Sequence, residues 1–342
     1  MLMPVVMFIV GTLITMVASI LFTNAIEHVG DVMNWSESFT GAIIAPLFTS
    51  IPELTIVLVA IFVHGGTAGQ EIGIGTIFGQ PFMTSSLSYA LVLLAMILGY
   101  KVGKRKDLHI YVDKRLAIPF IFTVVFFPIV LVPGVIHGFF VDVLFSLLFL
   151  GGYFYYAWLM YKSRVAEIEL EAELEAAGEE ALYLGKYLGE KLACLVQLIL
   201  AVIGLYYGSE MLVKSIDMIS RILQVSPLGA ALILAPAATA IPETMTAIIW
   251  GYHGKDTFAI ASLVGERILY STFYPAIGIL ITDWILDIYA YLSVFVTTLV
   301  SLVLIPYIRR GKIPSIILAS GFVFFVLYAA FVFLHSMFFQ PP

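Results

Sequence analysis

The sequence predicts an all-α integral membrane protein with ten transmembrane helices, arranged as two inverted five-helix repeats. Three observations predict this fold class: a strongly apolar composition, ten long apolar runs, and a match between the two halves of the chain. Of the 342 residues, 61% are hydrophobic and only 12% are charged, and the mean hydropathy is +1.04. Such values suit a lipid environment rather than a water-soluble core.

Each apolar run is long enough to cross a hydrocarbon layer of about 30 Å. The runs lie at 5–26, 39–63, 72–98, 116–134, 139–161, 192–213, 227–251, 257–281, 288–306 and 314–339. The first run lacks the basic start and the small-residue cleavage site of a signal peptide, so we interpret it as a transmembrane helix. The single cysteine, Cys194, excludes an intrachain disulfide framework and a cysteine-based metal cluster.

The distribution of basic residues predicts the orientation. An even number of spans places both termini on one side, and basic residues near helix ends are retained in the cytoplasm. With both termini outside, the cytoplasmic loops carry fourteen of the 17 Lys and Arg residues, and the outer loops carry only Lys214 and Arg221. We therefore expect a multi-pass protein of the cell (plasma) membrane with both termini outside, and we expect a monomer.

One strongly polar segment, 165–180, divides the chain. We expect a first five-helix repeat at 1–161 with its core at 39–98, an acidic cytoplasmic linker at 162–191, and a second, inverted repeat at 192–342 with its core at 227–281. The linker is interpreted as a connector, and a regulatory cation-binding loop is the alternative. Because this loop supplies the acidic excess, the net charge of −6 gives no indication of nucleic acid binding.

The two halves match most closely where 41–54 is set against 231–244, with seven of the fourteen positions identical. The identical pairs include Pro46 and Pro236, Pro52 and Pro242, and Glu53 and Glu243. Since each unit holds five spans, an odd number, the second copy enters the membrane from the opposite side.

A weaker match sets 73–86 against 259–272 and repeats a polar stripe at four-residue spacing, which places each stripe on one helix face. The stripes are Thr76, Gln80, Thr84 and Ser88 in the first copy, and Ser262, Glu266, Tyr270 and Tyr274 in the second.

These segments carry oxygen donors in the middle of predicted spans. A proline in a membrane helix frees backbone carbonyls, and a buried carboxylate costs several kcal/mol unless a cation or proton neutralises it. Hard oxygen donors suit Ca²⁺, Na⁺ or Mn²⁺. The candidate cation ligands are the carboxylates of Glu53 and Glu243, which are also the candidate metal ligands, together with Thr49, Ser50, Thr239, Thr84, Gln80, Glu266, Tyr270 and the carbonyls of Pro46 and Pro236.

Structural roles are the alternative for both groups. The glutamates could be protonated carboxyls that join helices, and the stripes could be ordinary interhelical hydrogen bonds, each contributing roughly 0.6 kcal/mol. If the ligand interpretation holds, Glu53, Glu243, Gln80 and Glu266 line one interior cavity. A Glu266 side chain that faces lipid or a distant helix would contradict that interpretation.

The segments 49–53 (Thr-Ser-Ile-Pro-Glu) and 239–243 (Thr-Ala-Ile-Pro-Glu) resemble the calcium/cation antiporter superfamily, specifically its sodium/calcium exchanger branch. The resemblance implies ten spans, central sites for transported Ca²⁺ and Na⁺ (or H⁺), no resident cofactor, and alternating access by sliding of the first and sixth helices. It also implies that Glu53 and Glu243 are the main Ca²⁺ ligands.

The chain departs from the family on the third and eighth helices. Thr84 and Tyr270 stand where the family has Asn or Asp ligands, Glu266 lies one turn earlier, and Arg267 follows it. Because a guanidinium stays protonated, Arg267 could compensate charge by standing in for one transported cation. The alternative is that Arg267 pairs with Glu266 or with another acid away from the site.

Three hypotheses follow for the function. The first is a cation antiporter, not an enzyme, that exchanges Ca²⁺ or a similar divalent ion against Na⁺ or H⁺. The second is a divergent member that transports another cation or a solute, with Arg267 replacing a bound cation. The third is an intramembrane lipid-modifying enzyme or a sensor, with Glu266 and Arg267 as the reactive pair.

Overall fold

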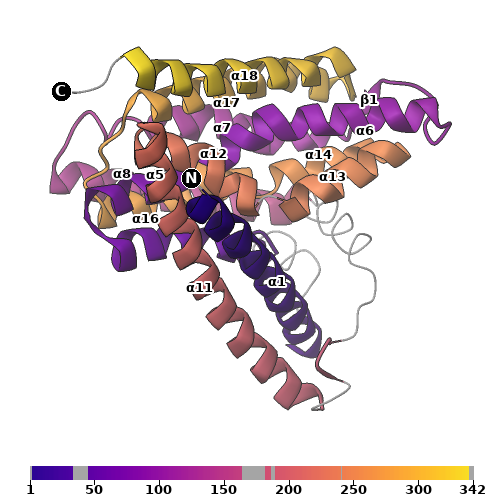
Figure 1. The fold of residues 1–342 in the computed structure, drawn as a ribbon. Coiled ribbons are helices and arrows are strands. Elements are labelled where there is room, and N and C mark those ends of the chain that lie inside the picture. Colours follow the sequence, from indigo (N-terminus) through magenta and orange to yellow (C-terminus); the bar gives the residue numbers. More distant parts are fainter. Residues whose placement is uncertain (1, 34–44, 164–181, 186–188, 240, 339–342) are drawn as a thin grey trace.

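A computed structural model describes residues 2–33, 45–163, 182–185, 189–239 and 241–338 of the chain (Figure 1). Most of these residues lie in helices, and two short strands, β1 (Ile110–Tyr111) and β2 (Lys312–Ile313), pair antiparallel. The long helices are α1 (Leu2–Met33), α8 (Phe139–Ser163), α11 (Glu190–Leu223), α17 (Ile288–Arg309) and α18 (Ser315–Phe338). Most of the predicted linker 162–191 lies outside the described residues, as do residues 41–44 of the first repeat motif.

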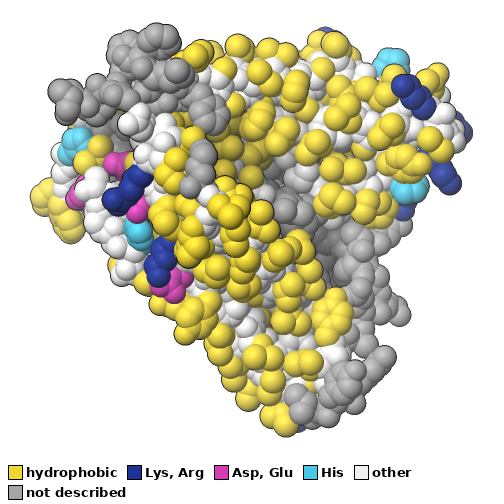
Figure 2. All heavy atoms as spheres, viewed as in Figure 1, with side chains coloured by type: hydrophobic (Ala, Val, Ile, Leu, Met, Phe, Trp, Pro, Cys, Tyr) yellow, Lys and Arg dark blue, Asp and Glu magenta, His cyan; other side chains and the backbone are white. Residues whose placement is uncertain are grey.

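The described helices form a membrane protein. Six segments are long and apolar enough to cross a bilayer, and a seventh is added if the bent pair α12 and α13 counts as one span. Large hydrophobic side chains cover much of the visible surface, including the projecting ends of α1 and α11 (Figure 2). The predicted count of ten is not reproduced by this criterion, because 45–64, 117–129 and 256–281 form short or interrupted helices.

Three of the predicted spans are interrupted in the membrane region. The first consists of α3 (Ala45–Thr49), α4 (Ile51–Leu58) and the π-helical η2 (Val59–His64). The second consists of α12 (Pro227–Thr239) and α13 (Ile241–His253), and the third of α14 (Asp256–Val264), α15 (Arg267–Ser271) and α16 (Phe273–Ile281). The first turns of α4, α13 and α16 each contain a proline: Pro52, Pro242 and Pro275. Proline is tolerated in a first turn because the N–H that it lacks has no partner inside the helix there, so these prolines favour the start of a new helix.

The centre of the bundle is α5 (Gly66–Met83), which runs through η3 (Thr84–Ser88) into α6 (Tyr89–Lys101). Every residue of α5 from Ile72 to Met83 is buried. Its backbone touches α12: a Cβ atom added at Gly75 would lie 2.5 Å from the carbonyl oxygen of Leu228, and one added at Gly79 would lie 2.5 Å from that of Leu232. Only glycine permits this approach, so α5 and α12 form the rigid support of the interrupted helices.

Helices α1 and α11 lie side by side and project at an angle from the other helices (Figure 1). Small residues line their contact: a Cβ atom at Gly208 would lie 2.4 Å from Thr15 Oγ1, and one at Gly204 would lie 2.8 Å from Ala18 Cβ. Because α1 makes most of its contacts with α11, the two helices form a unit that packs on the rest of the bundle through α11.

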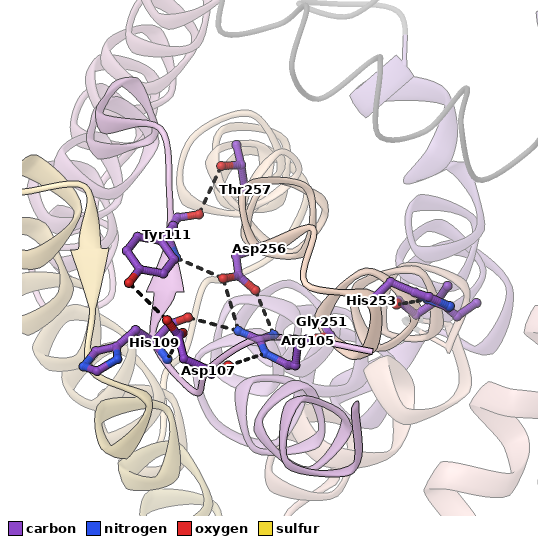
Figure 3. A network of polar contacts seen from close by, with 9 residues as sticks. Arg105, Asp107, His109, Tyr111, Gly251, His253, Asp256 and Thr257 are labelled. Atoms are coloured by element: carbon purple, nitrogen blue, oxygen red, sulfur yellow. Dashed lines mark hydrogen bonds and ion pairs between the residues drawn. The ribbon is translucent and has the colours of Figure 1, made fainter. Parts of the chain in front are cut away.

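A polar network joins the loop after α6 to the turn between α13 and α14 (Figure 3). Arg105 donates from Nη1 to Asp256 Oδ1 at 2.9 Å and to the carbonyl oxygen of Gly251 at 2.6 Å, and the backbone N–H of Tyr111 donates to Asp256 Oδ2 at 3.0 Å. Burial raises the pKa of the Asp256 carboxyl, while the Tyr111 N–H and the Arg105 guanidinium act in the opposite direction. The network fixes the ends of α6 and α13 to each other on one side of the bundle.

Candidate cation-binding site

Glu53 lies in the first turn of α4, directly after the interruption at Ser50. Its side chain is 1% exposed, and its Oε2 atom is buried without a hydrogen-bond partner among the described residues. A carboxylate in this position has lost its water shell, so a cation or a proton must neutralise it. The free N–H groups at the start of α4 also favour negative charge here.

Thr239 brings the second repeat to Glu53. It is the last residue of α12, it is buried, and its hydroxyl interacts with the Glu53 carboxylate. The same hydroxyl lies 3.1 Å from the carbonyl oxygen of Ala235, which accepts a hydrogen bond from it. The structure thus brings together residues from the two matching motifs, 49–53 and 239–243.

Glu266 lies between α14 and α15, at another helix interruption. Its carboxylate oxygen Oε1 accepts a hydrogen bond from the hydroxyl of Thr49, the last residue of α3, and its side chain is 9% exposed. Glu266 therefore faces the interior and the first repeat, not lipid. Two helix interruptions, one from each half of the chain, meet through this contact.

Tyr274, in the first turn of α16, contacts Ser50, the residue between α3 and α4. Its hydroxyl donates to the carbonyl oxygen of Ser50 at 3.2 Å and hydrogen bonds with the Ser50 hydroxyl. Both Glu53 and Glu266 act on it electrostatically. Tyr274 belongs to the predicted polar stripe, and its four-residue spacing from Tyr270 was the signal for it, but the sequence did not single it out as a site residue.

Gln80, Thr84 and Tyr270, the other stripe residues predicted to bind a cation, are also buried. Thr84 Oγ1 donates to the carbonyl oxygens of Gln80 at 3.0 Å and Pro81 at 3.1 Å. The Tyr270 ring packs edge-on against Tyr274, with 4.8 Å between the ring centroids. Tyr270 thus lies next to Tyr274, whereas the Thr84 hydroxyl accepts a hydrogen bond from Arg267.

Arg267 is 1% exposed and extends away from Glu266. It donates to the Tyr89 hydroxyl at 3.0 Å and to the hydroxyls of Thr84 and Ser301 at 3.3 Å each. The interpretation that it pairs with Glu266 is therefore wrong, because the guanidinium donates to these three hydroxyls instead. Within the described part of the chain, its hydrogen-bond partners are all neutral hydroxyls.

The positions of three further predicted ligands, Pro46, Glu243 and Pro236, complete the set. The side chains of Pro46 and Glu243 lie outside the described residues, although the backbone of Glu243 forms part of α13. Pro236 is buried in α12, where its Cγ atom would lie 2.9 Å from a Cβ atom at Gly79. Pro236 therefore packs at the contact between α5 and α12, one turn from Thr239.

A comparison with known protein families shows to which family the chain belongs. The sequence model of the family described as sodium/calcium exchanger protein matches residues 3–162 and 194–337. The chain belongs to this family. The resemblance of the two Thr-x-Ile-Pro-Glu segments to the calcium/cation antiporter superfamily is thereby confirmed, and the exchanger is a multi-pass membrane protein of the antiporter class.

Solved structures share the fold of this exchanger. The structure described as the H⁺/Ca²⁺ exchanger CAX aligns with a TM-score of 0.67 at 17% identity, covering 98% of this chain and 86% of that one. The structure of YfkE aligns with a TM-score of 0.58 at 18% identity, covering 97% and 99%. The sodium-calcium exchanger NCX_Mj aligns with a TM-score of 0.52 at 20% identity, covering 96% and 98%. The comparison with curated proteins found no match.

The donor set of the exchanger is uniformly hard. Two carboxylates and the hydroxyls of Thr49, Ser50 and Thr239 lie at or near the ends of interrupted helices. Oxygen ligands of this kind bind Ca²⁺ and Na⁺ in flexible geometries and are poor ligands for soft metals. The arrangement is chemically suited to reversible cation binding.

Proposed function

We propose that this exchanger is a secondary active antiporter that moves Ca²⁺, or a similar divalent cation, against Na⁺ or H⁺ by alternating access. The main support is the hydrogen bond from Thr49 to Glu266, which joins two helix interruptions, one from each half of the chain, next to the buried carboxylate of Glu53. Interrupted helices whose free ends face one another are typical of ion sites in secondary transporters.

Glu53 and Glu243 are the proposed principal ligands of the divalent cation, with Glu266 as a third carboxylate. Thr49, Ser50 and Thr239 orient these groups, because each hydroxyl contacts a carboxylate or Tyr274. The transported ions are cargo, and no resident cofactor is part of the proposal. Either counter-ion fits, since a proton and a Na⁺ ion both neutralise a carboxylate.

The proposed topology is ten membrane passages in two inverted repeats, 1–161 and 192–342, joined by the linker 162–191. The interrupted segments 45–64, 227–253 and 256–281 each count as a passage, although they do not form single long helices. Both termini lie outside the plasma membrane, and the protein acts as a monomer. The α1 and α11 pair, in contact through small residues, is the element that slides.

A second candidate is a transporter of another cation or a solute. The observation that favours it is Arg267, a fixed charge inside the bundle, together with Thr84 and Tyr270 on the helices that flank the site. Under this alternative the Glu53 site is kept and its selectivity for Ca²⁺ is lost.

The experiment is uptake of radioactive calcium into proteoliposomes, first under an outward Na⁺ gradient and then under an outward H⁺ gradient. Glu53→Gln, Glu243→Gln and Glu266→Gln are compared with the matched control Glu210→Gln, since Glu210 pairs with Lys214 on the exposed side of α11. We expect gradient-driven uptake that the site variants abolish and the control keeps.

Uptake under only one gradient identifies the counter-ion. No calcium uptake by folded protein under either gradient rejects calcium exchange, and uptake of another cation that still depends on Glu53 establishes the second candidate.

A further inference from the structure

Arg267 carries a positive charge in the interior of the bundle that the carboxylates do not neutralise directly. Its side chain is 1% exposed, and its Nε atom is buried without a hydrogen-bond partner among the described residues. Buried charges in proteins are normally paired with an opposite charge, and an unpaired charge inside a membrane span is costly. The position of Arg267 therefore requires an explanation from its surroundings.

The surroundings are electron-rich on several sides. Hydroxyl oxygens come from Thr84 on η3, Tyr89 on α6 and Ser301 on α17, each within hydrogen-bond distance of the guanidinium. The ring centroids of Tyr89 and Phe120 lie 5.6 Å and 5.2 Å from its central carbon. The hydroxyl oxygens accept hydrogen bonds from the guanidinium and the aromatic faces attract positive charge, so the surroundings of Arg267 suit a cation.

The helices that hold Thr84 and Ser301 carry two further buried hydroxyls. Ser85, which follows Thr84, and Thr297, one turn before Ser301 on the same face of α17, are both fully buried. In the described part of the structure neither hydroxyl has a hydrogen-bond partner. Oxygen donors are the ligand type that hard cations prefer.

We propose that Arg267 is a tethered cation whose guanidinium permanently fills a monovalent-cation site formed by Thr84, Tyr89 and Ser301. A guanidinium keeps its proton under essentially all conditions, so the site cannot release its charge. The consequence for transport rests on the proposed antiport. If this cage of Thr84, Tyr89 and Ser301 were open, it could bind a monovalent cation from solution, so with Arg267 in place the exchanger moves one monovalent cation fewer in each cycle.

The first test is cation binding by purified, full-length protein, which does not depend on transport. Melting temperatures of wild type, Arg267→Ala and Arg267→Met are measured in Na⁺, K⁺ or millimolar guanidinium, with choline chloride holding the ionic strength constant. The Ala variant opens the cage, and the Met variant fills it with neutral volume.

We expect the melting temperature of Arg267→Ala to rise saturably, at a cation concentration a hundredfold above Kd, by roughly 5 °C more than that of wild type and Arg267→Met, which keep the cage filled. No rise with any of the three cations overturns the proposal. A rise in wild type with chloride or sulfate, using choline as the common cation, also overturns it, because the site would then bind anions. If Arg267→Ala is not recovered folded, purification in guanidinium must recover it, and failure to do so counts against the proposal.

The second test is the Na⁺ dependence of transport in proteoliposomes. Opening the cage in Arg267→Ala raises the Hill coefficient for Na⁺ by about one, while Arg267→Lys, which keeps a tethered charge, retains the wild-type value. An unchanged coefficient in both variants overturns the tethered-cation role. Because binding is measured separately, an exchanger that carries no calcium leaves the first test intact, and a failed first test leaves calcium exchange standing.

Discussion

Glu53 and Glu266 each lie next to a point where a helix stops. Thr49 ends α3 shortly before Glu53, and Glu266 itself separates α14 from α15. The Thr49 hydroxyl bonds to Glu266, and Tyr274 bonds to Ser50, so these contacts hold the two interruptions together. At the scale of single residues, cation binding depends on these hydrogen bonds as much as on the carboxylates.

Thr49→Val tests the hydrogen bond to Glu266. The substitution keeps the side-chain shape and removes a donor to a charged group, a loss of about 1.5–3 kcal/mol, so we expect calcium affinity to fall roughly tenfold or more. Thr55→Val is the matched control, because Thr55 Oγ1 donates only within its own helix, to the carbonyl oxygen of Ile51 at 2.8 Å. Equal affinities in the two variants, measured by calorimetry, would show that Thr49 does not orient the site.

The sequence predicted which residues belong to the candidate site better than it predicted which residues they contact. Glu53, Thr49, Ser50 and Thr239 were found because Pro-Glu recurs in both halves, and the prolines mark the interruptions. The contacts of Arg267 could not be predicted, because Tyr89 and Ser301 lie on helices distant in sequence and carry no motif. Tyr274 was placed in the polar stripe by its spacing but was not chosen as a site residue, because its partner Ser50 lies on a helix distant in sequence.

At the scale of helices, the packing of α5 on α12 holds the interrupted segments in place. Hydropathy found these helices, since it depends only on composition, but it predicted continuous spans where the chain forms short segments. The interruption at Gly265 and Glu266 has no proline at the break itself, and a glycine alone weakens a helix by only about 1 kcal/mol, so hydropathy and proline positions did not predict it.

Gly79→Ala tests this packing. Its Cβ atom would lie 2.5 Å from the carbonyl oxygen of Leu232, so α5 and α12 must separate, and we expect a loss of about 2–3 kcal/mol of stability together with loss of transport. Gly151→Ala on α8 is the control, because a Cβ atom there meets nothing within 4 Å. Thermal unfolding in detergent distinguishes them, and an unaffected Gly79→Ala would mean that the two helices are not closely packed.

Arg105→Ala tests the network in Figure 3. Arg105 and Asp256 have side chains only 3% and 4% exposed, so removing one partner leaves a buried charge and costs about 3–5 kcal/mol. Arg115→Ala removes a pair with Asp113 that is 46% and 28% exposed, and we expect a change of about 1 kcal/mol or less. Similar melting temperatures for the two variants would contradict the structural role of Arg105.

At the scale of the whole molecule, the two inverted halves predict which loops face each side of the membrane. On the proposed topology, the loop after α6 and the turn after α13 lie on the basic, cytoplasmic side, and the segments near Val135 and Ile285 lie outside. Both of these residues are well exposed, at 65% and 63%.

Cysteine labelling tests this orientation in a Cys194→Ser background, which removes the single native thiol. We expect a membrane-impermeant maleimide to label Val135→Cys and Ile285→Cys in intact cells, and to label Lys104→Cys and Arg310→Cys only after permeabilisation. Labelling in the reverse pattern would place both termini inside, and labelling of all four in intact cells would reject the inverted arrangement.

Joint binding of one cation by Glu53 and Glu266 is tested most directly by calcium titration calorimetry on purified wild type, Glu53→Gln, Glu266→Gln and the double variant. If both carboxylates serve one site, each single variant loses most of the affinity and the double variant loses little more, which gives a coupling energy of about 1 kcal/mol or greater. Additive losses, or wild-type affinity in Glu266→Gln, would contradict a shared site.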